Sequence, residues 1–177
     1  MGKSHDLATA AAGFTFSGTV DASSGLTTPA GHVVQVGHTY NAQVSAHQTI
    51  STTSLVDVGV TCTLTPLSIN NKFIVTWTVS MAYGGNNAHY CAGVMKYKIG
   101  SGSYNFVDGA DGTNTPYNLG YNYSGDQYAP MTSTHEVDIT STSAYTFAPH
   151  YRGGSSSSSV WCHTRASYSL LVMEIAG

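Results

Sequence analysis

The sequence predicts an all-β protein, an antiparallel β-sandwich of the jelly-roll type, and two observations carry this prediction. Apolar and polar residues alternate along most of the 177-residue chain, in short segments separated by Gly, Pro, Asn and Ser. Charged residues make up only 8% of the chain, against about 25% in an average globular protein. Because surface helices depend on Glu, Lys and Arg, this composition favours strands and turns. We therefore expect two sheets packed around one core.

Four segments in the first half of the chain show the alternation. They are residues 14–20 (FTFSGTV), 31–44 (GHVVQVGHTYNAQV), 55–66 (LVDVGVTCTLTP) and 72–83 (KFIVTWTVSMAY). The fourth places Phe73, Val75 and Trp77 on one face. A period of two is the period at which side chains on a strand return to the same face. Each segment is therefore predicted to form a strand, or two in the case of residues 31–44.

Four further segments continue the pattern to the end of the chain. They are residues 91–100 (CAGVMKYKIG), 135–140 (HEVDIT), 144–151 (AYTFAPHY) and 167–177 (SYSLLVMEIAG). In the first of these, Lys96 and Lys98 fall on the face opposite Met95. The whole chain supplies roughly eight to ten strands, which suits a jelly roll.

The last segment is apolar on both faces. Leu171, Met173 and Ile175 alternate with Leu170 and Val172, and a strand that is apolar on both faces is buried on both. One face suits the core, so the other needs a second cover, for which a neighbouring subunit is the simplest candidate. The subunit-interface strand is predicted to contribute four residues: Leu171, Met173, Glu174 and Ile175.

Glu174 is a lone carboxylate within this apolar segment. We expect it to lie at the end of the strand, where it accepts from a backbone donor or pairs with an Arg across an interface. A buried carboxylate can also have a raised pKa and act as an acid. Because structural pairs often resemble catalytic sites, we do not assign Glu174 a catalytic role.

The predicted strands form one domain, residues 14–177, preceded by a short attachment arm, residues 1–13. The first residues lack the apolar core of a signal peptide, and no stretch approaches the ~20 apolar residues of a membrane span. We therefore expect synthesis in a cytoplasm and no membrane insertion. A net charge of −3 provides no basic surface for nucleic acid. So little charge also suggests that part of the surface is buried in an assembly.

No pattern in the sequence indicates an enzyme. The GxSxG, HExxH and Gly-rich phosphate-loop motifs are missing. A pair of carboxylates for glycoside hydrolysis would be spatial, and nine acidic residues offer few such pairs. We predict no catalytic residue and no cofactor.

Metal binding and cysteine pairing stay open. Eight His occur without an HxH or HxxxH pair, and residues 108–114 (DGADGTN) only loosely resemble a calcium loop. We predict no metal site. The alternative is that one of these histidines, or the loop at residues 108–114, binds a metal ion. The sequence has three cysteines, Cys62, Cys91 and Cys162. They are either three buried thiols, or two of them form a disulfide and the third is a free thiol.

Residues 108–134 are predicted to be the longest irregular stretch and the main candidate for recognition. Tyr, Asn and Gly together form an adaptable surface with little charge, and Tyr rings stack on sugars. The candidate receptor-contact residues are Tyr117, Asn118, Tyr121, Asn122, Tyr123 and Tyr128. The alternative is that these tyrosines close the end of the sandwich or line a subunit interface.

Several segments resemble a module of tailed-phage virion proteins, especially those of marine and cyanobacterial phages. They are residues 25–36 (GLTTPAGHVVQV), 61–81 (TCTLTPLSINNKFIVTWTVSM), 144–153 (AYTFAPHYRG) and 168–177. The positions that match the module are Pro66, Ser68, Lys72, residues 73–75, Met173, Glu174 and Ile175. The module is similar to the C-terminal β-sandwich head of tail fibres, which implies a trimer and no catalytic residues. Only about thirteen residues precede the first predicted strand, so we expect no long shaft of the kind that precedes such heads.

The resemblance leads to a functional hypothesis: a non-enzymatic virion structural protein, the head of a short homotrimeric fibre or appendage that contacts the host surface. Its partners would be two further copies of itself, tail or capsid proteins, and a host glycan or protein. It would be assembled in the host cytoplasm and reside in the virion. The main alternative is a capsid decoration protein that stabilises the head shell. A non-viral lectin-like or C1q-like module and a glycan-degrading enzyme are the other classes.

Overall fold

The computed structural model describes eight ranges, residues 30–41, 48–50, 52–84, 89–107, 118–122, 127–153, 159–162 and 168–177. The attachment arm predicted at residues 1–13 and the strand predicted at 14–20 lie outside them. The described residues are all-β, and none of them forms a helix long and apolar enough to cross a membrane.

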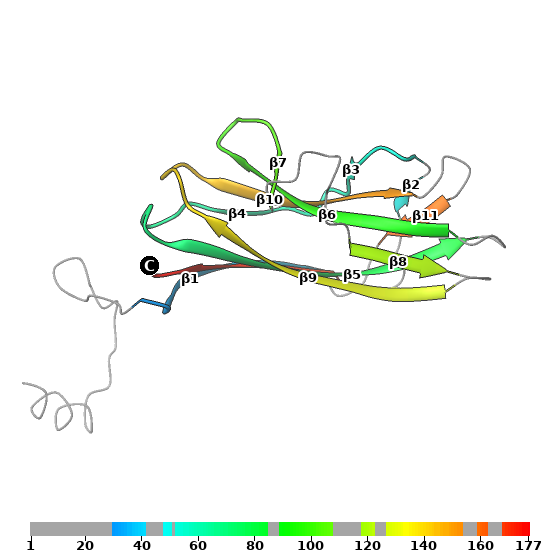
Figure 1. The fold of residues 1–177 in the computed structure, drawn as a ribbon, viewed down its shortest axis with the longest axis horizontal. Helices are drawn as coiled ribbons and strands as arrows, with labels where there is room; N and C mark the ends of the chain where they lie inside the picture. Colours follow the sequence, from blue (N-terminus) through cyan, green and yellow to red (C-terminus); the bar gives the residue numbers. More distant parts are fainter. Residues whose placement is uncertain are drawn as a thin grey trace, which may run out of the picture.

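Two antiparallel sheets pack face to face, as the sequence predicts (Figure 1). The first sheet is built on β5 (Lys72–Gly84), which pairs along one edge with β9 (Gln127–Asp138). Two strands share the other edge of β5, namely β12 (Tyr168–Ile175) and β11 (Ser159–Cys162). Outside these two lie β1 (Val33–Asn41), paired with β12, and β2 (Gln48–Ile50), paired with β11.

The second sheet is built on β10 (Tyr145–Gly153) and β6 (His89–Ile99), which pair along their length. Two short strands, β3 (Val56–Asp57) and β4 (Cys62–Leu64), follow the free edge of β10. Two others, β7 (Asn105–Phe106) and β8 (Asn118–Asn122), follow the free edge of β6.

Among the described strands, the chain crosses from one sheet to the other at six of the eleven steps between consecutive strands. The last strand, β12, lies between β1 and β5, so the first and last described strands are neighbours (Figure 1). The end of the chain is therefore an internal strand of the first sheet, which confirms the core strand predicted at residues 167–177.

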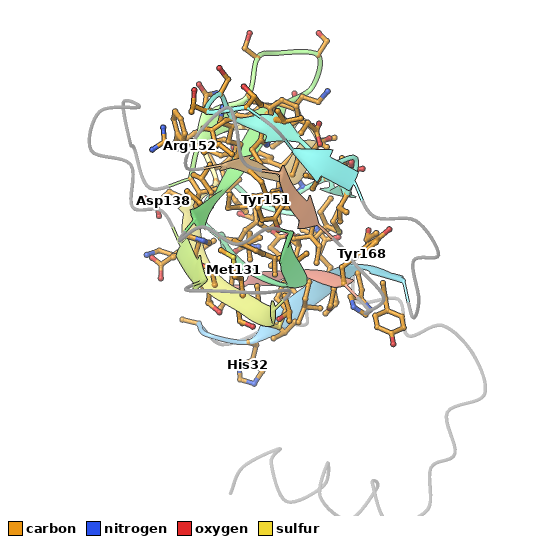
Figure 2. All side chains as sticks on the ribbon, turned by 90° about the vertical axis from the view of Figure 1, so that its right-hand side faces the viewer. His32, Met131, Asp138, Tyr151, Arg152 and Tyr168 are labelled. Carbon is orange, nitrogen blue, oxygen red and sulfur yellow. The ribbon has the colours of Figure 1, made fainter. Side chains whose placement is uncertain are left out.

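The core consists of the side chains that the two sheets direct at each other (Figure 2). Phe73 meets Phe147 with ring centroids 5.5 Å apart, and Trp77 meets Tyr151 edge-on at 5.6 Å. Gly93 makes this second contact fit: a β-carbon there would lie 2.9 Å from the Tyr151 ring and 3.0 Å from the Trp77 ring. The inward face predicted for residues 72–83 is confirmed over residues 72–79, because Phe73, Val75 and Trp77 are at most 1% exposed.

Residues 55–66, predicted as a single strand, form two short strands, β3 and β4. The alternation itself holds, since Val58, Val60 and Cys62 are buried. The pairing breaks at Gly59, which has a φ of +75° and donates its backbone N–H to Asp57 Oδ1 over 2.8 Å. A residue with left-handed backbone angles does not continue a strand. The backbone pairing is therefore interrupted, although apolar and polar side chains still alternate.

Residues 108–134 are not one irregular stretch, and this prediction is wrong. They contain β8 and the first part of β9. Pro130 and the polar run of Thr132, Ser133 and Thr134 hid this strand in the sequence. Pro130 fits because β9 is an edge strand of the described sheet, where a missing N–H can face away from the ladder.

Candidate functional site

The Glu174 carboxylate is fully buried and joins three separate segments of the chain. Its oxygens accept the backbone N–H groups of Leu67, at 2.9 and 3.1 Å, and of Ser68, at 3.3 Å. They also accept from the side-chain amides of Asn71, at 2.6 Å, and of Gln35 on β1. The carboxylate therefore fastens the turn between β4 and β5 to the end of β12.

The backbone donor expected for Glu174 is present, in the N–H groups of Leu67 and Ser68. The geometry also corrects one assignment, because Glu174 lies on the inner face of β12 with Leu170 and Val172, which are fully buried. It is therefore not part of the outer surface formed by Leu171, Met173 and Ile175. The described contacts of Glu174 hold the turn between β4 and β5, and the side chain of Gln35, against β12.

The outer face of the first sheet carries an apolar patch, which we define as Val36, Tyr40, Ile74, Leu171, Met173 and Ile175. The register brings these residues together, because Val36 pairs with Met173, which in turn pairs with Ile74. Val36 is 56% exposed and Tyr40 is 58% exposed. His38 lies between them, stacked on Tyr40 and 2.9 Å from the Ser169 hydroxyl. Antiparallel sheets usually turn polar residues to water, so this apolar patch is unusual.

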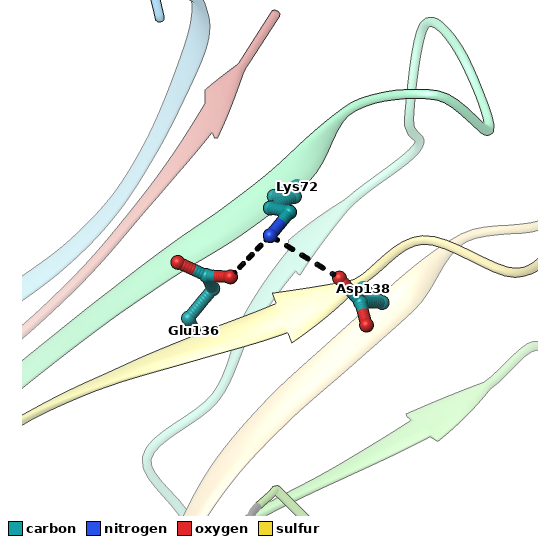
Figure 3. Close-up of polar contacts among 3 residues, drawn as sticks. All are labelled: Lys72, Glu136 and Asp138. Atoms are coloured by element: carbon teal, nitrogen blue, oxygen red, sulfur yellow. Dashed lines mark hydrogen bonds and ion pairs between the residues drawn. The ribbon is translucent and has the colours of Figure 1, made fainter. Parts of the chain in front are cut away.

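Beyond this patch, the described side chains of β5 and β9 on this outer face are polar. Threonine hydroxyls on β5 and β9 pair at 3.0 Å, Thr76 with Thr134 and Thr78 with Thr132. At the end of the two strands Lys72 Nζ lies 2.5 Å from Glu136 and 3.7 Å from Asp138 (Figure 3). The hydrogen bond with Glu136 raises the pKa of Lys72. These charges are paired within the chain and lie at one end of the face.

The outer face of the second sheet carries a different surface, the lysine–aromatic patch, defined as Lys96, Lys98, Tyr104 and Phe106. Lys96 and Lys98 share one face of β6, as the alternation predicts, and pair with Ala148 and Thr146 of β10. Lys96 Nζ lies 4.5 Å from the centre of the Phe106 ring, and Lys98 Nζ lies 5.1 Å from that of Tyr104. Burial lowers the pKa of Lys96.

His150 lies beside this patch and is only 6% exposed. Its ring meets Tyr104 edge-on at 5.0 Å, and its Nδ1 is 3.1 Å from the Ala148 carbonyl oxygen. Burial lowers the pKa of His150, and the positive charge of Lys96 adds to that effect, while the Ala148 carbonyl and Asp57 act in the opposite direction. Burial also raises the pKa of Tyr104.

The candidate receptor-contact residues do not form one loop. Asn118, Tyr121 and Asn122 lie in β8 of the second sheet, whereas Tyr128 lies in β9 of the first. Tyr117 and Tyr123 lie outside the described residues. Receptor contact by these six residues stays a prediction.

Cys62 is a free thiol, buried in the core, and burial raises its pKa. The side chains of Cys91 and Cys162 lie outside the described part of the chain, as does the loop at residues 108–114. Among the described residues, no three His, Cys, Asp or Glu side chains come close enough together to hold a metal ion.

Sequence reasoning missed the lysine–aromatic patch as a possible site. The signal available was the placement of Lys96 and Lys98, two of only six cations, on one face of a strand. The return of the chain through β7, which brings Phe106 to Lys96, left no signal of this kind. The sequence matches no protein-family model, and a comparison with curated proteins finds no significant match.

Proposed function

We propose that this protein is a non-enzymatic structural subunit that assembles as a homotrimer through the apolar patch, as the head of a short phage appendage. The observation that carries the proposal is the patch itself, in which Val36 and Tyr40 are each more than half exposed. Contiguous apolar surface on a sheet commonly marks a protein–protein interface. The trimer and the virion setting come from the resemblance to phage tail-fibre heads.

The charges of this face are compatible with a second copy of the same chain as the partner, provided that they stay at the rim of the contact. An identical face brings like charges toward each other unless they are already neutralised. Lys72 is paired with both Glu136 and Asp138, and the three groups together keep a net charge of −1. They border the patch, because Lys72 pairs with Ile175 and Glu136 pairs with Ile74. Two or three copies can bury their apolar patches in a closed symmetric arrangement that leaves this charged edge in water.

Light scattering of the purified protein tests the proposal. We expect a mass three times the 18.6 kDa of a single chain. Met173→Glu places a charge in the middle of the patch and should reduce the mass to that of one chain, since burying an unpaired charge is costly. Monomeric wild-type protein at micromolar concentration would contradict the trimer.

Ile69→Glu is the matched control. Ile69 is 56% exposed in the turn between β4 and β5, and the substitution is the same exchange of an apolar residue for an acid. We expect this variant to remain trimeric. Equal dissociation of both variants would mean that added charge, and not the patch, controls assembly.

The position in the particle needs a separate measurement. Quantitative mass spectrometry of the parent virion gives the number of copies. A count that matches the few symmetric positions on a tail supports the appendage, whereas a count that matches the many equivalent positions of a capsid supports the decoration protein.

A further inference from the structure

The lysine–aromatic patch is built where the chain turns back along the free edge of β6 and joins the second sheet as β7. After β6 the chain turns at Gly100, which has a φ of +55° and donates its N–H to the Ala144 carbonyl over 2.8 Å. It returns as β7, where Phe106 pairs with Lys96. The turn and the strand thus fix the two rings against the two lysine side chains.

The rings hold the ammonium groups in place without neutralising them. A cation over an aromatic face gains about 0.5–1 kcal/mol at an exposed site. Neither lysine forms an ion pair with a described carboxylate, because the ion pairs found there are those of Lys72. Lys96 and Lys98 are both half-buried. The patch therefore presents two oriented positive charges that are partly removed from water.

Asp57 is a carboxylate near this patch: it pairs with His150 in the register, and its negative charge acts on both His150 and Tyr104. It forms no ion pair with either lysine, since the ion pairs among the described residues are those of Lys72. In a chain with a net charge of −3, two adjacent lysines that pair with no carboxylate in the described part of the chain concentrate positive charge at one place. An anionic group is the natural complement of this place.

The neighbouring groups indicate what carries the anionic group. The hydroxyls of Thr63 and Thr146 lie 2.9 Å apart next to Lys98, and they can exchange hydrogen bonds with hydroxyls of a ligand. Nucleic acid would need a longer row of phosphate contacts than two lysines provide. A sugar acid combines one carboxylate with many hydroxyls, and it fits this combination best.

We propose that the lysine–aromatic patch binds an acidic glycan, with Lys96 and Lys98 contacting a carboxylate of the sugar. Same-face positions on a strand are about 7 Å apart, so both ammonium groups can approach one carboxylate or two neighbouring ones. The inference rests on the proposed function, because it specifies the host-surface contact as an acidic polysaccharide. It places that contact on the sheet opposite the apolar patch.

Calorimetry with oligogalacturonate, a chain of sugar carboxylates, tests the proposal. We expect binding that weakens as salt is added, and no binding of a neutral maltooligosaccharide. The double variant Lys96→Gln/Lys98→Gln should bind at least about tenfold more weakly. Lys96→Arg/Lys98→Arg keeps both charges and should bind within about threefold of the wild type.

Lys72→Gln is the matched control, since it removes one positive charge from the opposite face, and we expect unchanged binding. The proposal is overturned if the wild type does not bind oligogalacturonate, or if the Gln double variant binds as well as the wild type. Equal binding of polyglutamate would identify an acidic peptide as the partner and also overturn it. Light scattering on the same samples separates this failure from failure of the trimer.

Discussion

The outer face of the first sheet is apolar where β1, β12 and β5 meet, whereas the outer face of the second sheet presents Lys96 and Lys98 beside aromatic rings. Both faces belong to antiparallel sheets that share one core. Their chemistry differs because the inward residues serve the core and leave the outward residues free to vary. One face is therefore suited to burial against another chain, and the other to contact with a charged ligand in water.

Among the variants that test this difference between the two faces, the largest loss of stability is expected from Glu174→Ala in the first sheet. The change removes the fully buried carboxylate that accepts from the part-buried N–H groups of Leu67 and Ser68 and from the side-chain amide of Asn71. We expect a loss of about 3 kcal/mol in the free energy of unfolding. That corresponds to a fall of roughly 6–12 °C in the unfolding temperature for a chain of this length. Calorimetry at fixed protein concentration measures it.

Glu174→Gln serves as the companion variant. Its amide keeps one oxygen acceptor but turns an NH₂ group toward the donors. A smaller loss than that of Glu174→Ala is therefore expected. If the alanine variant unfolded at the wild-type temperature, the carboxylate would not be what holds β12 to the turn.

A smaller loss of stability is expected when the pH is lowered, through His150 on the outer face of the second sheet. Burial lowers the pKa of His150 below its ordinary value of 6.5, so the unfolded chain takes up this proton more readily than the folded chain. Stability from His150 is complete above about pH 6.5 and decreases as the pH falls toward the folded-state pKa. Asp57, Lys96 and Tyr104 are the titratable groups that surround the imidazole.

The unfolding temperatures of wild type and His150→Gln, followed from about pH 7.5 to about pH 5, isolate this contribution from that of the other histidines. The wild type should lose more stability than the variant over this range. Parallel curves for the two proteins would show that His150 is not the group responsible.

The smallest effect is expected from Lys72→Met, at the charged end of the first face. Lys72 and its partners Glu136 and Asp138 are each at least half exposed, and exposed ion pairs contribute little because water and salt screen them. The unfolding temperature should not change measurably in the Met173→Glu background, which isolates the single chain. A clear decrease would show that this charged end, and not only the apolar patch, supports the first sheet.

The faces of the long strands could be predicted from the sequence because alternation is a local property. The inward side of β5 and the shared face of Lys96 and Lys98 follow from a period of two. The same reasoning failed for β9, where Pro130 and a threonine-rich run conceal the pattern. It also failed at Gly59, because a single left-handed residue interrupts pairing without disturbing the alternation.

The partners of these faces could not be predicted, because they come from distant parts of the chain. Glu174 accepts from Leu67, 107 positions earlier, and nothing local to either residue indicates the other. The same holds for the pairing of Val36 with Met173, on which the apolar patch depends. The six residues expected in one recognition loop are divided between β8 and β9 and the residues that flank them.

The sequence alone therefore determined the fold class, the strand faces and the presence of an apolar residue set on both sides of the final strand, since each depends on neighbouring residues. Only the tertiary structure decided that this strand lies between β1 and β5, that the Glu174 carboxylate turns inward, and that Phe106 and Tyr104 cover the lysines. These arrangements depend on which strands pair, and pairing is chosen by the burial of the whole core.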